Sequence, residues 1–334
     1  MKPDRSFDLG THAVHLRWRE EEAPVRDPSL GLSFLLKQKG ETRPIVEGDA
    51  VIDLRSVDAI EEPAGFRPVF EGTFDTGTTI RLASDEDGWT LLTAQSRLAT
   101  TDRPTHLVMD VLSTAGQAAA DAMVMALEHA HALARRVLIH AACIESASGT
   151  VLLHAPSGAG KTTTALALAI AGLPLQSDDT SILHIADDAV HAEGLPRDPR
   201  LHRRSVEMLP DLAAGLDGER DRDDGRWDAN DERFIRRERL PGLFVAPQPR
   251  PIHAFVSLER TDGALRVEPS DPYDGLRRLI SDNLSFAAGQ LHPLHGLKLD
   301  ILTAALAQGR CWHVEGSGSP QAIAGAIREA LERE

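Results

Sequence analysis

Aromatic side chains are scarce in this chain of 334 residues, in which nine Phe, four Trp and one Tyr make up 4% of the total. Alanine and leucine must therefore supply most of the buried surface, and the hydrophobic fraction of 42% is sufficient for globular cores. No apolar run approaches the roughly 18 residues that a membrane-spanning helix needs. The first residues also lack the apolar core of a signal peptide. We therefore expect no membrane partner.

Cysteine is nearly absent as well, with Cys143 and Cys311 as the two examples in the sequence. Neither belongs to a paired motif of the kind that binds zinc or forms a redox disulfide. Such sparse usage is typical of proteins in reducing compartments. A cytoplasmic location is the expectation.

Basic residues are outnumbered, because 36 Lys and Arg stand against 51 Asp and Glu, and the formal net charge is −15 at pH 7. A surface with this excess of negative charge repels polyanions, which argues against nucleic acid and anionic membranes as partners. The excess does not exclude a small phosphate ester, because a phosphate-binding loop creates a local positive site.

The length favours two domains, since domains typically have about 100–200 residues. Residues 1–105 show the pattern of a β-rich N-terminal domain, with short apolar segments separated by Gly, Pro and Asp turns. Residues 106–334 form the second predicted domain, and a dense charge run at 217–239 predicts a loop within it. The strands predicted in the first domain are 13–18, 32–36, 50–54, 69–74, 78–82 and 89–92.

The second predicted domain alternates helical and strand-like patterns, which is typical of an α/β fold. A helical pattern covers 115–135, and two strands at 137–146 and 151–154 predict a β-hairpin. Ser319 is a predicted helix N-cap, with Pro320 at the first helical position. The other elements predicted after residue 182 are a strand at 253–259, helices at 274–279 and 297–308, and a strand at 310–314.

The most informative stretch follows the second strand of this hairpin. It reads Ala155-Pro-Ser-Gly-Ala-Gly160-Lys161-Thr162-Thr163 and leads into a helix-forming run. A strand, a small-residue loop and a helix in this order are typical of a phosphate-binding loop, whose backbone N–H groups face the phosphates. Lys161 is predicted to reach the β- and γ-phosphates, and Thr162 to ligate Mg²⁺. The predicted nucleotide ligands are Ser157, Gly158, Ala159, Gly160, Lys161, Thr162 and Thr163.

One residue of the loop departs from the usual eight-residue pattern. Ala155 stands where the first glycine is usual. Alanine is the smallest substitute for glycine, so we expect the loop to form with a slightly different entry.

Two adjacent carboxylates, Asp178 and Asp179, end the next predicted strand. Residues 162–177 separate them from Lys161, which is enough for one helix and one strand that returns beside the loop strand. Ligands bind at the carboxyl ends of strands in α/β sheets, so both carboxylates should lie near the phosphates. One would hold Mg²⁺, and the other would accept the proton of an attacking hydroxyl. The sequence leaves open which Asp has which role.

Other polar residues are weaker candidates. The arginines of 233–239 and Arg250 could stabilise the transferring phosphoryl group. Ser205 and Glu207 follow a basic cluster at 197–204 and could contact an acceptor.

Taken together, these motifs resemble the HPr kinase/phosphorylase family, bacterial enzymes that phosphorylate a protein serine with a phosphate loop. The resemblance covers about residues 137–182. The matching residues, in the order and spacing of that family, are His140-Ala141, Ser157-Gly158-Ala159-Gly160-Lys161-Thr162, Ala165-Leu166, Gly172 and Asp178-Asp179.

The resemblance implies a P-loop kinase domain of the HPr-kinase and phosphoenolpyruvate-carboxykinase type, with ATP and Mg²⁺ as cofactors. It implies that Lys161, Thr162 and one Asp handle phosphates and metal, and that the other Asp is the base. It also implies that His140 lies near the transferred phosphoryl group. The acceptor would be a serine-type hydroxyl of a peptide, protein or small molecule. The related family forms hexamers, which leaves a homo-oligomer open here.

Two regions depart from that family. The later signature segment associated with phosphorolysis is not found, and the charge run 217–239 lies in its place. Residues 1–105 do not match the family's usual N-terminal domain.

Two other functions are compatible with the motifs. One is a small-metabolite kinase on the ordinary phosphate-loop fold. The main alternative is a P-loop regulatory or assembly ATPase that couples hydrolysis to a partner's conformational change. It predicts a catalytic Glu after a long apolar strand, and none stands out.

Overall fold

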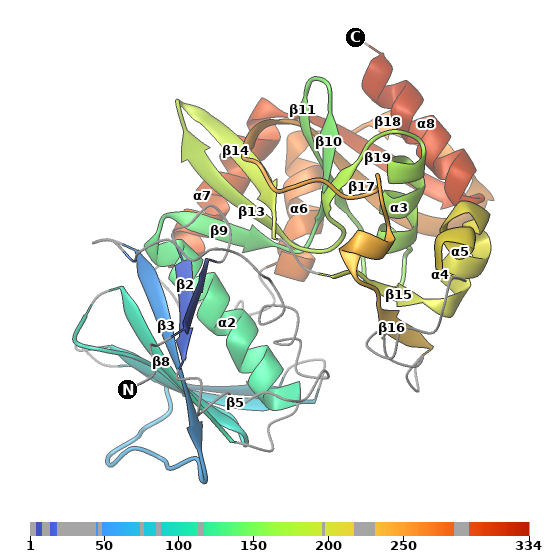
Figure 1. Ribbon diagram of the computed structural model, residues 1–334. Coiled ribbons are helices and arrows are strands. Elements are labelled where there is room, and N and C mark those ends of the chain that lie inside the picture. Colours follow the sequence, from blue (N-terminus) through green and yellow to red (C-terminus); the bar gives the residue numbers. More distant parts are fainter. Residues whose placement is uncertain are drawn as a thin grey trace. The chain divides into compact units, whose positions relative to one another are not determined.

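The structure is a computed structural model in which the described residues form two compact units, each with its own sheet (Figure 1). Unit 1 consists of Met1–Val137 and Phe286–Leu297, and unit 2 of Leu138–Ser285 and Lys298–Glu334. Both combine helices with sheets, so the chain has a mixed α/β fold. The described residues are 5–8, 14–18, 45, 49–73, 77–84, 88–103, 105–112, 117–195, 198–216, 231–283 and 294–333.

Unit 1 contains an eight-stranded sheet in the order β1-β2-β3-β8-β7-β6-β5-β4. Helix α2 (Gln117–Leu133) packs on β3, β7 and β8. Its sheet-facing positions include small residues, Ala119, Ala122 and Ala126, which are fully buried and let the helix approach closely. The strands β1 to β8 are, in chain order, Arg5–Asp8, Val14–Trp18, Ala50–Val57, Phe70–Thr73, Thr79–Ser84, Trp89–Leu92, Ser96–Thr100 and His106–Leu112.

Five of the six strands predicted for the first domain are confirmed as β2 to β6, and the sixth, 32–36, lies outside the described residues. The predicted boundary between 105 and 106 differs from the division into units. It would separate β7 from β8, which pair antiparallel, and would also remove α2 from the strands that it covers. Because these contacts join 106–137 to the first sheet, unit 1 extends to Val137.

Unit 2 contains a nine-stranded mixed sheet with the main order β12-β10-β11-β17-β14-β13-β9. β19 (Arg310–Ser317) runs parallel to β17 and pairs antiparallel with β18 (Arg266–Pro269). The chain passes from unit 1 to unit 2 within β9 (Arg136–Ile139). The other strands of the main path are β10 (Ala142–Ser146), β11 (Gly149–His154), β12 (Leu175–Ser177), β13 (Ser181–Ala186), β14 (Ala189–Gly194) and β17 (Arg250–Ala264).

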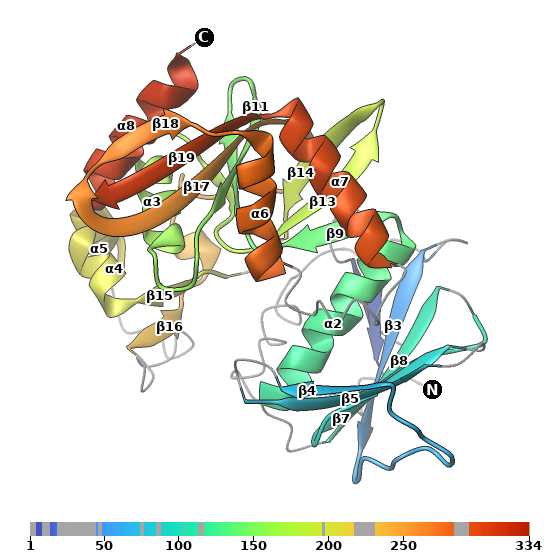
Figure 2. The same cartoon turned by 180° about the vertical axis from the view of Figure 1, so that it is seen from behind.

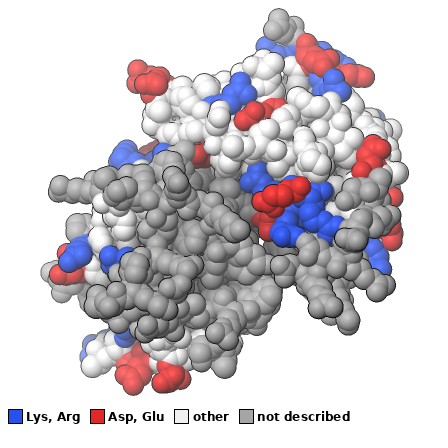
Figure 3. All heavy atoms as spheres, viewed as in Figure 1, with Lys and Arg blue, Asp and Glu red and all other residues white. Residues whose placement is uncertain are grey.

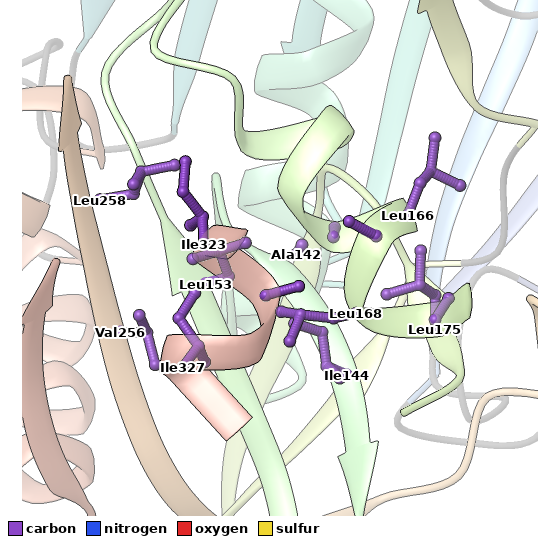
Figure 4. Packing of buried hydrophobic residues seen from close by; sticks show 14 of the residues in the cluster. Ala142, Ile144, Leu153, Leu166, Leu168, Leu175, Val256, Leu258, Ile323 and Ile327 are labelled. Carbon is purple, nitrogen blue, oxygen red and sulfur yellow. The ribbon is translucent and has the colours of Figure 1, made fainter. Parts of the chain in front are cut away.

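Successive side chains of a strand point to opposite faces of the sheet, so a strand with a continuous run of buried residues needs cover on both faces. Helices provide this cover. Val256 and Leu258 of β17 belong to the core beneath α3 (Lys161–Ile170) and α8 (Pro320–Glu332). Figure 4 shows Leu166 of α3 and Ile323 of α8 in this core. The other face carries α6 (Pro272–Asn283) and α7 (Leu294–Gln308), and this face is turned towards the viewer in Figure 2.

A smaller subdomain follows β14. A two-stranded antiparallel sheet is formed by β15 (Arg200–His202) and β16 (Glu232–Phe234). The short helices α4 (Arg203–Met208) and α5 (Pro210–Leu216) lie between these strands in the chain. A 3-10 helix, η3 (Arg237–Arg239), comes next. The charge run predicted as a loop is therefore partly structured, since 231–239 includes β16 and η3, while 217–230 lies outside the described residues.

The predictions for the second domain agree with the structure in their main elements. The hairpin is formed by β10 and β11, and Ser319 caps α8 by accepting from the Ala322 N–H at 3.2 Å. The strand predicted at 137–146 is divided into β9 and β10 by His140 and Ala141. No helix of the described residues is long and apolar enough to cross a membrane.

Candidate active site

The candidate site lies at one edge of the unit 2 sheet, where three chain segments meet. β10 lies between β11 and β12 and is antiparallel to both, so β11 and β12 run in the same direction. The loop after β11, the carboxylates after β12 and the residue before β10 therefore reach the same edge. The prediction that β12 returns directly beside β11 differs from the structure, because the hairpin strand β10 occupies that place.

A pocket of about 530 Å³ opens at this edge, here called the unit 2 pocket. Nine of the ten sequence-predicted site residues line it, namely His140, Ser157, Gly158, Gly160, Lys161, Thr162, Thr163, Asp178 and Asp179. Ala159 does not line the pocket and instead packs against the hydrophobic core. The volume falls within the roughly 300–1,000 Å³ that is typical of small-molecule sites.

The loop between β11 and α3 has the backbone of an anion cradle. Gly158 and Gly160 adopt positive φ angles of 77° and 95°, which favour glycine. Gly160 is the N-cap of α3, and no side chain caps this helix end. The Thr164 N–H makes the intrahelical bond to the Gly160 carbonyl at 2.9 Å, so the N–H groups of residues 161–163 precede the helical ladder. An anion in the pocket would meet these donors and the positive end of the helix dipole.

Ala155, at the usual first-glycine position, is fully buried and contributes to the hydrophobic core of unit 2. Among the described non-glycine residues, the positive φ angles belong to Arg135, Asp187, Asp188 and Asp231. Ala155 therefore does not need glycine's conformational freedom, and its methyl group fills core volume.

Lys161 is the centre of a compact polar cluster. Its side chain is 7% exposed, and its ammonium donates to Asp179 Oδ1 at 2.8 Å and to the Asp179 carbonyl at 3.2 Å. It also lies 3.0 Å from His140 Nε2. His140 Nδ1 in turn lies 3.3 Å from Asp179 Oδ1. An ammonium group can only donate hydrogen bonds, so the imidazole nitrogen that accepts its N–H must carry no proton.

The two adjacent carboxylates occupy different surroundings. Asp179 is partly exposed and receives a hydrogen bond from the Thr180 hydroxyl at 3.2 Å, besides that from Lys161. Asp178 is only 1% exposed and lies in the field of Arg237. Burial lowers the pKa of Arg237, and the charges of Asp198 and Asp178 act in the opposite direction. The two carboxylates are thus adjacent in sequence but have different electrostatic partners.

The arginines that the sequence suggested for phosphate contact have other positions. Arg237 donates to the carbonyls of Gln176 at 3.1 Å and Val245 at 2.8 Å, and its guanidinium lies 4.7 Å from the Phe244 ring centre. Arg250 donates to the Ser146 carbonyl at 2.8 Å. None of the arginines of 233–239, nor Arg250, lines the pocket. Arg237 and Arg250 hold backbone segments in place.

Arg260 is a pocket residue that the sequence analysis missed. It lies beyond the point where β17 pairs in parallel with β11, His154 opposite Ser257, so β17 carries it to the same sheet edge as the phosphate loop. A Cβ placed on Gly160 would lie 3.6 Å from the Arg260 Nε. The strand predicted at 253–259 ends one residue before Arg260, whereas β17 continues to Ala264. A longer predicted strand would have included Arg260.

A second group of missed residues comes from the β15–β16 sheet and α4, which contribute Arg200, His202, Arg204, Met208 and Glu232 to the lining. The predicted acceptor contact Ser205 also lines the pocket, and its buried hydroxyl lies 2.7 Å from the Thr163 hydroxyl. The other predicted acceptor contact, Glu207, is exposed and does not line it.

The oxygen ligands of the pocket suit Mg²⁺ better than a metal that needs a complete protein cage. No group of three or more His, Cys, Asp or Glu side chains among the described residues could hold an ion. Thr162, Asp178 and Asp179 nevertheless bring a hydroxyl and two carboxylates to one pocket. Mg²⁺ is commonly held by one or two carboxylates together with water and phosphate oxygens, so this set fits it.

No protein-family model matches the chain, and no curated protein sequence does. Among solved structures, the chain is similar to the Hpr(Ser) kinase/phosphatase from Coxiella burnetii. The similarity has 13% sequence identity and a TM-score of 0.29, and covers 58% of this chain and 95% of that chain. A similarity of this size establishes neither a shared fold nor a shared activity.

Proposed function

We propose that unit 2 is an ATP-dependent kinase domain of the HPr-kinase type, which transfers the γ-phosphate of ATP to a serine-type hydroxyl. The observation that supports this proposal is the convergence of the glycine loop, Lys161 and two carboxylates on one pocket. Phosphoryl transfer needs mainly positioning and charge neutralisation, and these residue types supply both. The acceptor is a peptide, a protein or a small hydroxylated molecule.

The phosphates of ATP bind at the N-terminus of α3. The uncapped helix end and the left-handed glycines provide backbone donors, and Lys161 provides a cation. Arg260, exposed and close to Gly160, provides a second positive charge at the loop. Lys161 must leave its contacts with Asp179 and His140 to reach the phosphates.

We assign Asp179 to the metal because of its contact with Lys161. Once the ammonium of Lys161 contacts a phosphate, the carboxylate that it contacted lies close to phosphate oxygens, and two anions at this separation require a cation. Thr162 and Asp179 would hold Mg²⁺ there. When bound, Mg²⁺ neutralises the charge that develops on the phosphoryl oxygens.

Asp178 is then the proton acceptor. It lines the pocket at 1% exposure, and its charge interacts with that of Arg237. In the reaction the acceptor hydroxyl loses its proton to Asp178 as its oxygen bonds to the γ-phosphorus. The bond between that phosphorus and the bridging oxygen breaks, and ADP leaves. His140 contacts Lys161 and Asp179 and positions both.

The test is an incubation of the full chain with ATP, Mg²⁺ and a pool of serine peptides, with ADP and phosphopeptides quantified by mass spectrometry. Asp178→Asn keeps the shape of the side chain but removes the base, so phosphopeptide formation should fall by about 10²–10⁴-fold. Asp179→Asn should raise the Mg²⁺ concentration needed for half-maximal rate. The proposal fails if ATP consumption is unaffected by both changes and no acceptor is phosphorylated. Phosphate release with water as the sole acceptor would support the alternative of a regulatory ATPase.

A further inference from the structure

The unit 2 pocket has a second basic region, away from the predicted phosphate loop in sequence and carried by different elements. We propose that Arg200, His202 and Arg204, here called the basic wall, bind carboxylate groups beside the hydroxyl of the acceptor. The kinase would then select an acidic serine peptide. This inference rests on the proposed function, because it names the acceptor class of the same pocket.

Two residues of the basic wall, Arg200 and His202, are held by the β15–β16 sheet. Leu201 is fully buried, so its neighbours Arg200 and His202 project together from the opposite face of β15. Both contact the cross-strand carboxylate of Glu232, Arg200 at 2.6 Å and His202 at 2.8 Å. One carboxylate thus contacts two basic side chains, which shows that this pair of side chains can bind a carboxylate. Figure 3 shows basic and acidic side chains gathered on this part of unit 2.

Arg204 supplies a further charge. It is exposed, lines the pocket and has no ion pair with any of the described residues. Four arginines occur within the eight residues 197–204 of a chain whose formal net charge is −15. A local excess of basic side chains in an acidic protein indicates an anionic ligand.

The basic wall is physically joined to the phosphate site. Ser205, next to Arg204, is 6% exposed, and its hydroxyl lies 2.7 Å from that of Thr163 in the first turn of α3. This contact fixes the start of α4 against the helix that receives the phosphates. A ligand held by Arg204 is therefore held in the pocket that contains Asp178.

The chemistry of the nucleotide makes it a poor occupant of the basic wall. The negative charge of ATP is confined to its phosphates, for which Lys161, Arg260 and the helix end are available. Adenine and ribose are neutral, and pockets for such rings are lined mainly by apolar and aromatic side chains. The basic wall itself has no apolar side chain, and Met208 is the one apolar residue that α4 adds to the described lining. The remaining anionic ligand is the acceptor.

The experiment uses the full chain with ATP, Mg²⁺ and an equimolar mixture of serine heptapeptides flanked by Glu, Gln or Lys. Arg204→Gln is compared with Arg203→Gln, which removes the same charge from the same helix. Arg203 pairs with Asp231 and does not line the pocket, so it is a matched control. Arg204→Lys tests whether charge alone suffices. Thermal unfolding of each variant checks the fold.

The wild type and Arg203→Gln should phosphorylate the Glu-flanked peptide at least about tenfold faster than the Gln-flanked one, as expected for a charge-assisted contact. Arg204→Gln should reduce this preference by raising the KM for the Glu peptide, with the KM for ATP unchanged. Equal phosphorylation of all three peptides, or an Arg204→Gln effect on ATP alone, would overturn the inference but leave the kinase proposal intact. ATP turnover without any phosphopeptide also overturns it. Absence of both ATP binding and turnover would instead reject the proposed function.

Discussion

Unit 1 and unit 2 each contain a pocket of about 530 Å³, but the two pockets differ in how many ionisable side chains line them. Among the described lining residues, nine of the unit 2 pocket are ionisable, whereas the unit 1 pocket has one, Arg81. Arg81 pairs with Glu62 at 2.6 Å, and Thr78 at the unit 1 pocket donates to the buried Asp121 at 2.6 Å. Polar groups in unit 1 thus pair to stabilise the fold, while those in unit 2 converge on an open volume. Volume alone does not identify a functional site.

Among the changes that compare the two units, the largest effect should come from Lys161, one of the residues that converge on the unit 2 pocket. Lys161→Met removes the cation that neutralises phosphate charge and should reduce phosphoryl transfer by about 10²–10³-fold. Arg81→Met removes the one ionisable side chain of the unit 1 pocket and is the control. Rates of phosphopeptide formation by mass spectrometry measure both. A loss of similar size in Arg81→Met would show that the two pockets are not functionally different.

A substitution in unit 1 should affect stability and leave catalysis unchanged. Thr78→Val keeps the side-chain shape but removes the hydrogen bond to Asp121, which should lower the free energy of unfolding by about 1–3 kcal/mol. Chemical denaturation measures this change, and ATP turnover at a temperature well below unfolding measures activity. A fall in turnover of the still-folded variant would contradict the structural role assigned to this pair.

His131 makes the stability of unit 1 depend on pH. It is fully buried, and among the described residues neither ring nitrogen has a hydrogen-bond partner. Burial, and to a smaller extent the charge of Arg136, lowers the pKa of His131 from 6.5 to about 3. The unfolded chain therefore binds more protons between these values, so stability is full above pH 6.5 and is lost as the pH falls towards 3.

Between pH 7 and pH 5 this single group should lower the free energy of unfolding by about 2 kcal/mol. Urea denaturation at the two pH values measures the change. His131→Leu removes the titrating group, and the stability of this variant should fall less over the same interval. An identical pH dependence in both proteins would show that His131 does not control it.

The smallest effect is expected at Ala155, which occupies the usual position of the first glycine in the phosphate loop. Ala155→Gly restores the usual residue, but the position does not need a positive φ and the methyl group is buried. We expect a loss of about 1 kcal/mol in stability and ATP affinity within about twofold of the wild type. A large gain in affinity would show that Ala155 constrains the loop.

The local part of the site was predictable from sequence because its residues are close along the chain. A strand, a glycine loop and a helix specify the position of Lys161 and Thr162, and one further helix and strand bring Asp178 to the same edge. His140 was placed near them only by the family resemblance, and the structure shows that the β10–β11 hairpin is what brings it to this edge.

The rest of the site depends on pairing between distant segments, which a single sequence does not specify. Arg260 reaches the phosphate loop because β17 pairs with β11, about a hundred residues earlier in the chain. The basic wall depends on pairing of β15 with β16, two short strands of three residues each. The same reason explains the domain boundary, because the pairing of β8 with β3 and β7 shows that 106–112 belong to unit 1.

Titration calorimetry of Mg²⁺-ATP into the full chain tests the central claim, that the α3 end of the unit 2 pocket binds the phosphates of ATP. The account predicts saturable binding at one site per chain, weakened at least about tenfold in Lys161→Met, as expected for loss of a charged contact, and unchanged in Arg81→Met. No binding to the wild type, or equal affinity in wild type and Lys161→Met, would contradict it.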